Sequence, residues 1–131
     1  EGQVALNLIV MTQSGSIRKN LNNRRRDIVG DAVNLRAANP NAFVAVLYLL
    51  RATEEATQKG QAGTSPINEL AAFLSDLQAA DAHMGRPLLD AAALIAADLQ
   101  PDGRVRIEPP PRDVDVLQGF FDKSARFLRT S

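Results

Sequence analysis

The residues best suited to chemistry are a cluster of cations near the start of the sequence. Arg18, Lys19, Arg24, Arg25 and Arg26 place five positive charges within nine residues, interspersed with asparagines. Contacts to nucleic-acid phosphates require such a cluster, and Arg and Asn can also read base edges from a helix in a major groove. No aromatic residues are interleaved to stack on bases, and acidic residues follow closely. Nucleic-acid binding is therefore the alternative function that we carry forward.

Residues for catalysis or metal binding do not converge in the sequence. His83 is the only histidine, and a catalytic triad built on it would need a nucleophile elbow of the G-x-S-x-G type, which is absent. Asp81 and His83 offer at most two metal ligands. Glu54 and Glu55 are adjacent, so on a helix they would point about 100° apart and could not share a proton. We predict no catalytic residue, no cofactor and no metal site, and we lean towards a non-enzymatic protein.

Length and composition favour one domain. The 131 residues suffice for a single hydrophobic core, and no repeat or long polar linker divides them. The composition is 45% hydrophobic but only 5% aromatic, with no Trp, so Ala, Leu, Val and Ile must build the core. Small apolar residues of this kind favour closely packed helices. We predict one helical domain over residues 1–131.

Charge and cysteine content limit the partners and the compartment. The 15 basic residues balance the 15 acidic ones, so the overall field favours neither a polyanion nor a membrane surface. The chain has no Cys, which fits both reducing and oxidising compartments. Its longest apolar run, 42–50, is too short to span a membrane. We predict a soluble chain and favour the cytoplasm. Because it begins at Glu1 without Met, we expect a processed or excised segment rather than an intact signal peptide.

Apolar periodicity predicts two helices in the first half of the chain. After Ser16, a plausible cap, apolar residues at 17, 21, 28, 32 and 35 lie on one helical face. Pro40 breaks this helix, and Asn41 can cap a second one that runs to Lys59 and ends at Gly60. The apolar run 42–50 would form the buried first half of the second helix.

Three further helices are expected in the second half. Ser65 and Pro66 place a capping hydroxyl before proline at the first helical position, and an apolar stripe follows from Ile67 to Leu77. The segment Gly85-Arg86-Pro87 ends that helix and begins another through Leu99, so these two helices are predicted to pack as a hairpin. A last amphipathic helix is predicted from about Asp113.

Two segments show strand patterns. Residues 104–108 alternate strictly between polar and apolar, which suits a half-buried strand after the turn at 100–103. The run Val4 to Met11 fits either a strand or a helix, and its β-branched content favours the strand. The fold class predicted from all these elements is mainly α: a compact bundle of about five helices with one or two short β-strands.

The function that remains by elimination is protein interaction. We predict a non-enzymatic interaction or assembly module, a helical scaffold that binds another protein or copies of itself. Phe120, Phe121 and Phe127 are candidate interface residues, and the run Val4 to Met11 is a second candidate contact surface. For both, burial in the core is the commoner outcome.

Overall fold

The chain folds around a four-stranded mixed β-sheet. The computed structural model describes residues 5–13, 16–59, 63–79, 86–107 and 117–130. The strands are β1 (Leu6–Gln13), β2 (Phe43–Arg51), β3 (Ala91–Leu99) and β4 (Val105–Ile107), and the helices are α1 (Ile17–Ala38), α2 (Glu54–Thr57), α3 (Pro66–Gln78) and α4 (Leu117–Thr130). The strand order is β1-β2-β3-β4, with β1, β2 and β3 parallel and β4 antiparallel to β3.

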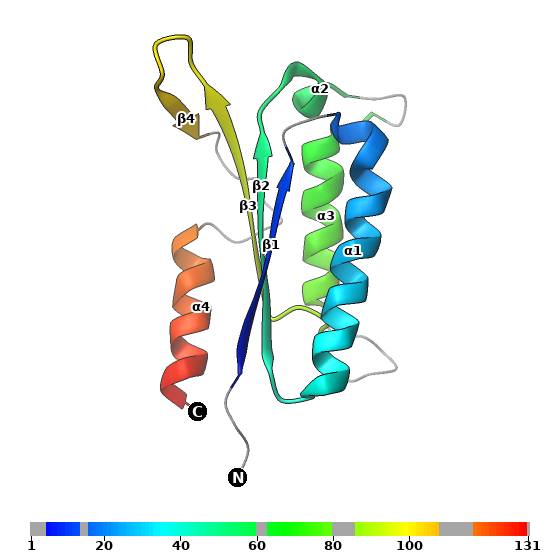
Figure 1. The fold of residues 1–131 in the computed structure, drawn as a ribbon, viewed down its shortest axis with the longest axis vertical. Helices are drawn as coiled ribbons and strands as arrows, with labels where there is room; N and C mark the ends of the chain where they lie inside the picture. The colour runs from blue at the N-terminus through cyan, green and yellow to red at the C-terminus, as the bar shows by residue number, and fades with distance from the viewer. Residues whose placement is uncertain (1–4, 14–15, 60–62, 80–85, 108–116, 131) are drawn as a thin grey trace.

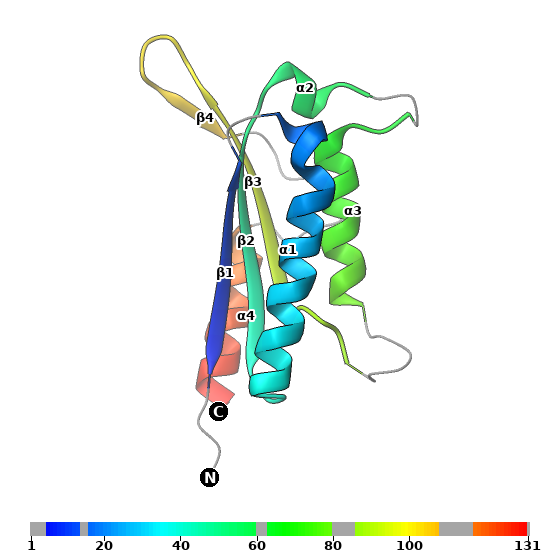
Figure 2. The same cartoon turned by 45° about the vertical axis from the view of Figure 1, so that its right-hand side comes forward.

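The sheet lies between two helical layers (Figure 1). Each step from one parallel strand to the next crosses through a helix, α1 first and then α3. Both crossovers move in the same direction along the sheet, and crossovers of this type are right-handed, so both helices cover the same face. α4 covers the opposite face and packs against β3 and β2 (Figure 2). The fold is therefore α/β, and the prediction of a mainly α bundle of five helices is wrong.

The predicted second helix is the central strand β2. Its residues 43–51 pair with β1 on one side and with β3 on the other, and Val44, Val46 and Tyr48 are fully buried. A parallel strand covered on both faces is apolar at every position, so it lacks the alternation that marks a half-buried strand. The same continuous run therefore resembles a buried helix. Only the four residues of α2 are helical in the predicted range 41–59.

The predicted fourth helix is β3, and the helical hairpin with α3 does not form. This segment is rich in Ala, which is the best helix former in isolation. In the folded chain, however, it completes the parallel sheet, and the pairing of a whole strand outweighs intrinsic propensity. The small side chains serve the packing here, because Phe120 of α4 lies against Ala91 and Ala93 in one buried cluster.

Other predicted elements are confirmed. α1 buries Ile17, Leu21, Ile28 and Ala32 as expected, and the Ser65 hydroxyl accepts a hydrogen bond from Asn68 N at 3.2 Å to cap α3. α3 ends at Gln78, earlier than predicted. The segments 4–11 and 104–108 contain strands, although all three residues of β4 are exposed rather than half-buried. The last helix is α4, and its predicted start near Asp113 lies outside the described residues.

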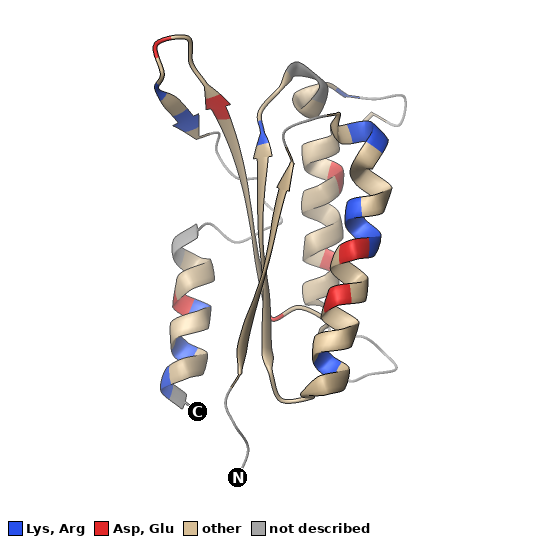
Figure 3. Ribbon diagram, in the orientation of Figure 1, with Lys and Arg blue, Asp and Glu red and all other residues tan. Residues whose placement is uncertain are grey.

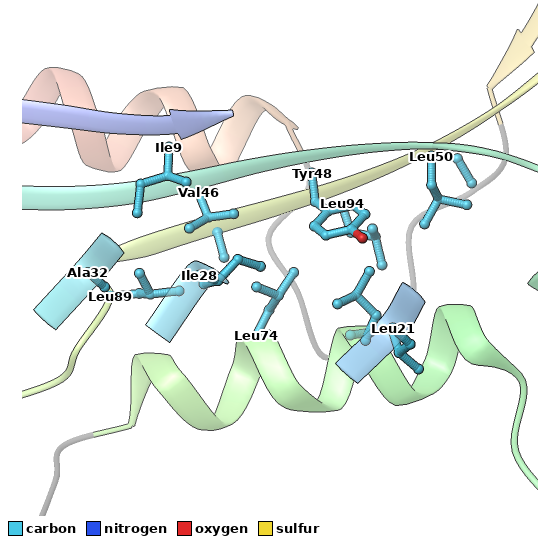
Figure 4. Packing of buried hydrophobic residues seen from close by; sticks show 14 of the residues in the cluster. Ile9, Leu21, Ile28, Ala32, Val46, Tyr48, Leu50, Leu74, Leu89 and Leu94 are labelled. Atoms are coloured by element: carbon cyan, nitrogen blue, oxygen red, sulfur yellow. The ribbon is translucent and has the colours of Figure 1, made fainter. Parts of the chain in front are cut away.

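The main core lies between the sheet and the layer of α1 and α3 (Figure 4). Tyr48 of β2 sits there without solvent exposure, and its hydroxyl donates a hydrogen bond to Gln13 Oε1 at 2.5 Å. The Gln13 amide in turn donates to Ser16 O at 3.2 Å. These bonds join the end of β1 to the start of α1. Burial raises the pKa of Tyr48 to about 12, and the charge of Arg24 opposes the shift.

Stability is expected to fall at high pH because of Tyr48. The phenol of the unfolded chain ionises at a pKa of about 10, whereas the folded chain holds its proton to about 12. The unfolded state therefore binds fewer protons between these values, and the free energy of unfolding decreases as pH rises from 10 to 12, by about 2–3 kcal/mol. Below pH 10 the phenol keeps its proton in both states, so Tyr48 causes no loss of the free energy of unfolding there.

The chain contains one Tyr and no Trp, so near-ultraviolet absorbance reports the phenolate of this residue alone. We expect a midpoint near 12 for the folded protein and an ordinary midpoint in denaturant. In the Tyr48→Phe variant the loss of stability between pH 10 and 12 should be smaller. An ordinary midpoint in the folded protein would contradict the burial of this hydroxyl.

Candidate protein-interaction surface

β1 forms one edge of the sheet, with only β2 paired to it among the described strands. Ile9 and Met11 pack into the core beneath α1. Leu6, Leu8 and Val10 alternate with them and lie on the opposite face of the strand. Leu8 is 46% exposed and Val10 is 52% exposed, because α4 packs against β2 and β3 rather than against β1. The edge strand therefore presents a row of aliphatic side chains to solvent.

The free side of β1 also presents backbone hydrogen-bonding groups. Ala5 O accepts from Phe43 N at 2.9 Å, and Leu6 lies opposite Phe43 in the parallel register. In such a ladder the residues that bond to the neighbouring strand alternate along the chain. The odd-numbered residues of β1 therefore bond to β2, whereas the even-numbered residues 6, 8, 10 and 12 direct their N–H and C=O groups away from the sheet. No described strand pairs with that side.

The two edges of the sheet differ in how well they are protected against pairing with another strand. The other edge is β4, which is three residues long and carries Arg106, whose guanidinium lies 3.7 Å from the Asp98 carboxylate. Short length and charge are two of the means by which natural edge strands avoid pairing with other chains. β1 has eight residues, LNLIVMTQ, with no charge and no proline. β1 is neither short nor charged, and it is therefore the edge that is suited to accept another strand.

α4 extends the apolar surface beside β1. Phe121 and Leu128 are both more than half exposed and lie two turns apart on one side of α4. Lys123 projects from nearly the opposite side of α4 and donates to Gln78 Oε1 of α3 at 3.4 Å. Since α3 lies next to β3, Lys123 points towards the β3 side of α4, so Phe121 and Leu128 project from the opposite side of α4, towards β1. We call the set Leu6, Leu8, Val10, Phe121 and Leu128 the β1 surface.

The three phenylalanines singled out in the sequence lie in different surroundings. Phe120 is 2% exposed and belongs to the core between α4 and the sheet. Phe127 is half-buried, and its ring centre lies 4.9 Å from that of Phe43. Phe121 alone is mostly exposed and is part of the β1 surface. The sequence signal that separates Phe120 from Phe121 is their 100° offset on a helix, which becomes informative only once the covered side is known.

The five clustered cations do not form one face. They all lie on the first half of α1 (Figure 3), but Arg24 pairs with Asp27 at 3.1 Å, whereas Arg25 lies over the Phe73 ring of α3 at 5.6 Å from its centre. Arg18 donates to Gln58 O at 3.0 Å. Lys19 and Arg26 are exposed. Three of the five side chains thus have partners within the chain, on different sides of α1.

Hollows adjoin the sheet at the open edge of β1 and at the carboxyl ends of the parallel strands. One is a groove of about 350 Å³ between β1 and α1, lined by residues 8–11 together with Asp31, Asn34 and Leu35. The other, of about 320 Å³, lies at the carboxyl ends of the parallel strands, where Arg51 and Thr12 border an apolar floor. Ligands often bind at that end of an open α/β sheet, but one cation, one hydroxyl and the Gln13 amide do not make a catalytic arrangement. The first groove follows the open edge of β1.

The remaining candidates for chemistry give no site within the described residues. Asp81 and His83 lie outside them, and the side chains of Glu54 and Glu55 are likewise not described. The part of the chain that is described holds no group of three or more His, Asp or Glu residues placed to share a metal ion. None of its helices combines the length and apolar character needed to cross a membrane.

The β1 surface is thus the feature of the described chain whose geometry suits a function, and that function would be contact with another polypeptide. Strand, edge and flanking helix all contribute to it, and none of it depends on a bound ion or cofactor. No family model matches this sequence, and neither a curated protein nor a solved structure shows significant similarity to it.

Proposed function

We propose that this chain is a non-enzymatic protein-interaction module that binds a polypeptide along the open edge of β1. The observation that carries the proposal is the coincidence of unpaired backbone groups and exposed aliphatic side chains on one uncharged strand. In strand addition, backbone hydrogen bonds supply affinity, and alternate side chains supply specificity. β1 offers both, on residues 6, 8, 10 and 12.

The flanking elements suit the same role. α1 borders the groove along β1 with the polar residues Asp31 and Asn34, and α4 borders the other face of β1 with Phe121 and Leu128. An added strand would therefore have an apolar side towards α4 and a mixed side towards α1. Aromatic and aliphatic centres with polar rims are the usual composition of protein interfaces.

Nucleic-acid binding is less well supported. A phosphate-binding helix needs several cations that reach the same backbone, whereas Arg24 pairs with Asp27 and Arg25 lies over the Phe73 ring, about 100° apart around α1. Arg18, Lys19 and Arg26 are exposed, but Arg18 donates to Gln58 O, and these few charges supply little affinity at physiological salt.

Site-specific photo-cross-linking, carried out in cells that naturally produce this chain, tests the proposal. A photoreactive amino acid at Val10, in the β1 surface, is compared with the same amino acid at Val33 on α1, which is the matched control because Val33 is 47% exposed. We expect a discrete protein adduct from position 10 and none from position 33. Mass spectrometry then identifies the adduct.

Three outcomes would count against the proposal. Equal adducts at both positions would show nonspecific contact, and the absence of a protein adduct at position 10 would show that β1 stays free. A third variant, with the photoreactive amino acid at position 26, tests the alternative function, which is nucleic-acid binding. Adducts to nucleic acid from position 26, without a protein adduct from position 10, would favour the basic helix as the functional site.

A further inference from the structure

We propose that the partner on β1 is a second copy of this chain, joined by antiparallel β1–β1 pairing across a two-fold axis. This inference rests on the proposed function, because it names the polypeptide that occupies the same edge. A two-fold axis perpendicular to the sheet brings the same strand of both copies together in opposite directions. The result is one continuous eight-stranded sheet.

The register of this pair follows from the backbone. Residues 6, 8, 10 and 12 carry the outward N–H and C=O groups, and in an antiparallel ladder two such residues exchange both of their bonds. An axis at Ile9 places residue 8 opposite residue 10 of the partner subunit, and residue 6 opposite residue 12. All four outward-facing residues of each copy then find a bonding partner. With an axis at Leu8 or at Val10, one of these four residues at an end of the strand has no counterpart within β1.

The side chains of β1 are compatible with self-pairing in this register. On the open face, Leu8 packs beside the partner's Val10, and Leu6 packs beside the partner's Thr12. Aliphatic and β-branched cross-strand pairs stabilise sheets, whereas like charges directly opposite each other destabilise them. The strand carries no charge, so a copy of itself meets no repulsion along the ladder. Apolar residues lie at the centre of the pair and Thr12 at its ends.

The helical layers also fit. α1 packs over β1 and β2, close to the free edge. Neighbouring strands are about 4.8 Å apart, so pairing at this edge separates the two α1 helices by about two strand spacings, or roughly 10 Å. Packed helices lie 8–10 Å apart in general. The side of α1 next to the edge groove carries Asp31 and Asn34, and the nearby Asp27 is already neutralised by Arg24. This spacing therefore allows the α1 layer to continue across the axis.

Charge exchange at positions 8 and 10 tests both the partner and the register. One variant carries Leu8→Lys with Val10→Lys, and the other carries Leu8→Glu with Val10→Glu. In the proposed register each variant opposes its own charges, so we expect its dimer Kd to rise at least about tenfold above that of the wild type. In an equimolar mixture of the two variants, each Lys at position 8 or 10 lies opposite a Glu of the other variant. We expect this mixture to form the dimer again. The mass is measured by light scattering after size exclusion, and by sedimentation.

A second variant pair tests the backbone bonds. Val10→Pro removes an outward N–H while the bonds from β1 to β2 stay intact, and proline is tolerated on edge strands. Val10→Thr keeps the N–H and the β-branched shape. We expect a monomer for the first and a dimer for the second, both with the circular dichroism of the wild type. If Val10→Pro fails to fold, the charge variants, which alter only exposed side chains, decide the question.

The inference is overturned if the wild type is a monomer at all concentrations tested. It is also overturned if the mixed charge variants stay monomeric while the wild type dimerises, or if Val10→Pro folds and dimerises as the wild type does. These results leave the proposed function intact when position 10 cross-links to a different protein in cells. If position 10 gives no protein adduct and the wild type is monomeric, both proposals fall.

Discussion

Replacing Arg36 with alanine is expected to lower the free energy of unfolding by about 3 kcal/mol. Arg36 is buried near the end of α1, and its Nη2 lies 2.6 Å from Asp90 Oδ2. Its Nη1 donates to Ala42 O, and Asp90 Oδ2 also accepts from Val44 N at 2.9 Å. One ion pair therefore ties the end of α1 to the start of β2 and to the segment before β3. Removal of the guanidinium leaves a carboxylate that is only 21% exposed without its counter-charge.

The surface pair of Arg24 and Asp27 supplies the matched control for Arg36. Both partners are more than a third exposed, so Arg24→Ala should cost less than about 1 kcal/mol. Urea titration of the two variants beside the wild type gives the comparison. The double variant Arg36→Met with Asp90→Asn should recover part of the loss, because no charge is then buried alone. Equal losses for Arg24→Ala and Arg36→Ala would contradict the role assigned to the buried pair.

The second large effect is expected at Phe120. Phe120→Ala should destabilise the protein by about 3–5 kcal/mol, since it empties the contact between α4 and the small side chains of Ala91 and Ala93. The adjacent Phe121→Ala should change stability by only about 0.5 kcal/mol, because Phe121 is 53% exposed. Two neighbouring residues of the same type thus serve as variant and control.

Limited proteolysis gives a second measurement for this pair. Basic residues of α4 at 123, 126 and 129 are cleavage sites for trypsin, and local opening of a helix increases its cleavage. Phe120→Ala should speed cleavage within α4, whereas Phe121→Ala should leave it unchanged and weaken only contacts made through the β1 surface. Similar stability and similar cleavage in both variants would show that α4 is not anchored by Phe120.

The variants fall into two groups, one that tests the stability of the fold and one that tests association with a partner. Arg36 and Phe120 are buried and fix the elements to one another, so their replacement is expected to act on the free energy of unfolding. Leu8 and Val10 are exposed, so their replacement is expected to act on association while the monomer stays folded. A variant at position 10 that unfolds the chain would therefore show that β1 is held less firmly than its pairing with β2 implies.

The sequence by itself determined the elements whose signals are local. α1 and α3 have one buried stripe each, with caps and prolines in the expected places, because an amphipathic helix repeats its pattern within a single segment. The turn before β4 is of the same kind, whereas the run Val4 to Met11 fitted both a strand and a helix, and only its pairing with β2 decided for the strand. Ser65 and Pro66 specified the start of α3 through bonds that span three residues.

Only the tertiary structure decided the rest. β2 and β3 are apolar on both sides, and a segment buried on both faces has no periodicity to distinguish strand from helix. Their pairing joins residues more than 30 positions apart, which no local window contains. The exposure of Leu8 and Val10 has the same origin. The strand order makes β1 an edge, and the position of α4 leaves its face uncovered, so the candidate site exists only in the assembled sheet.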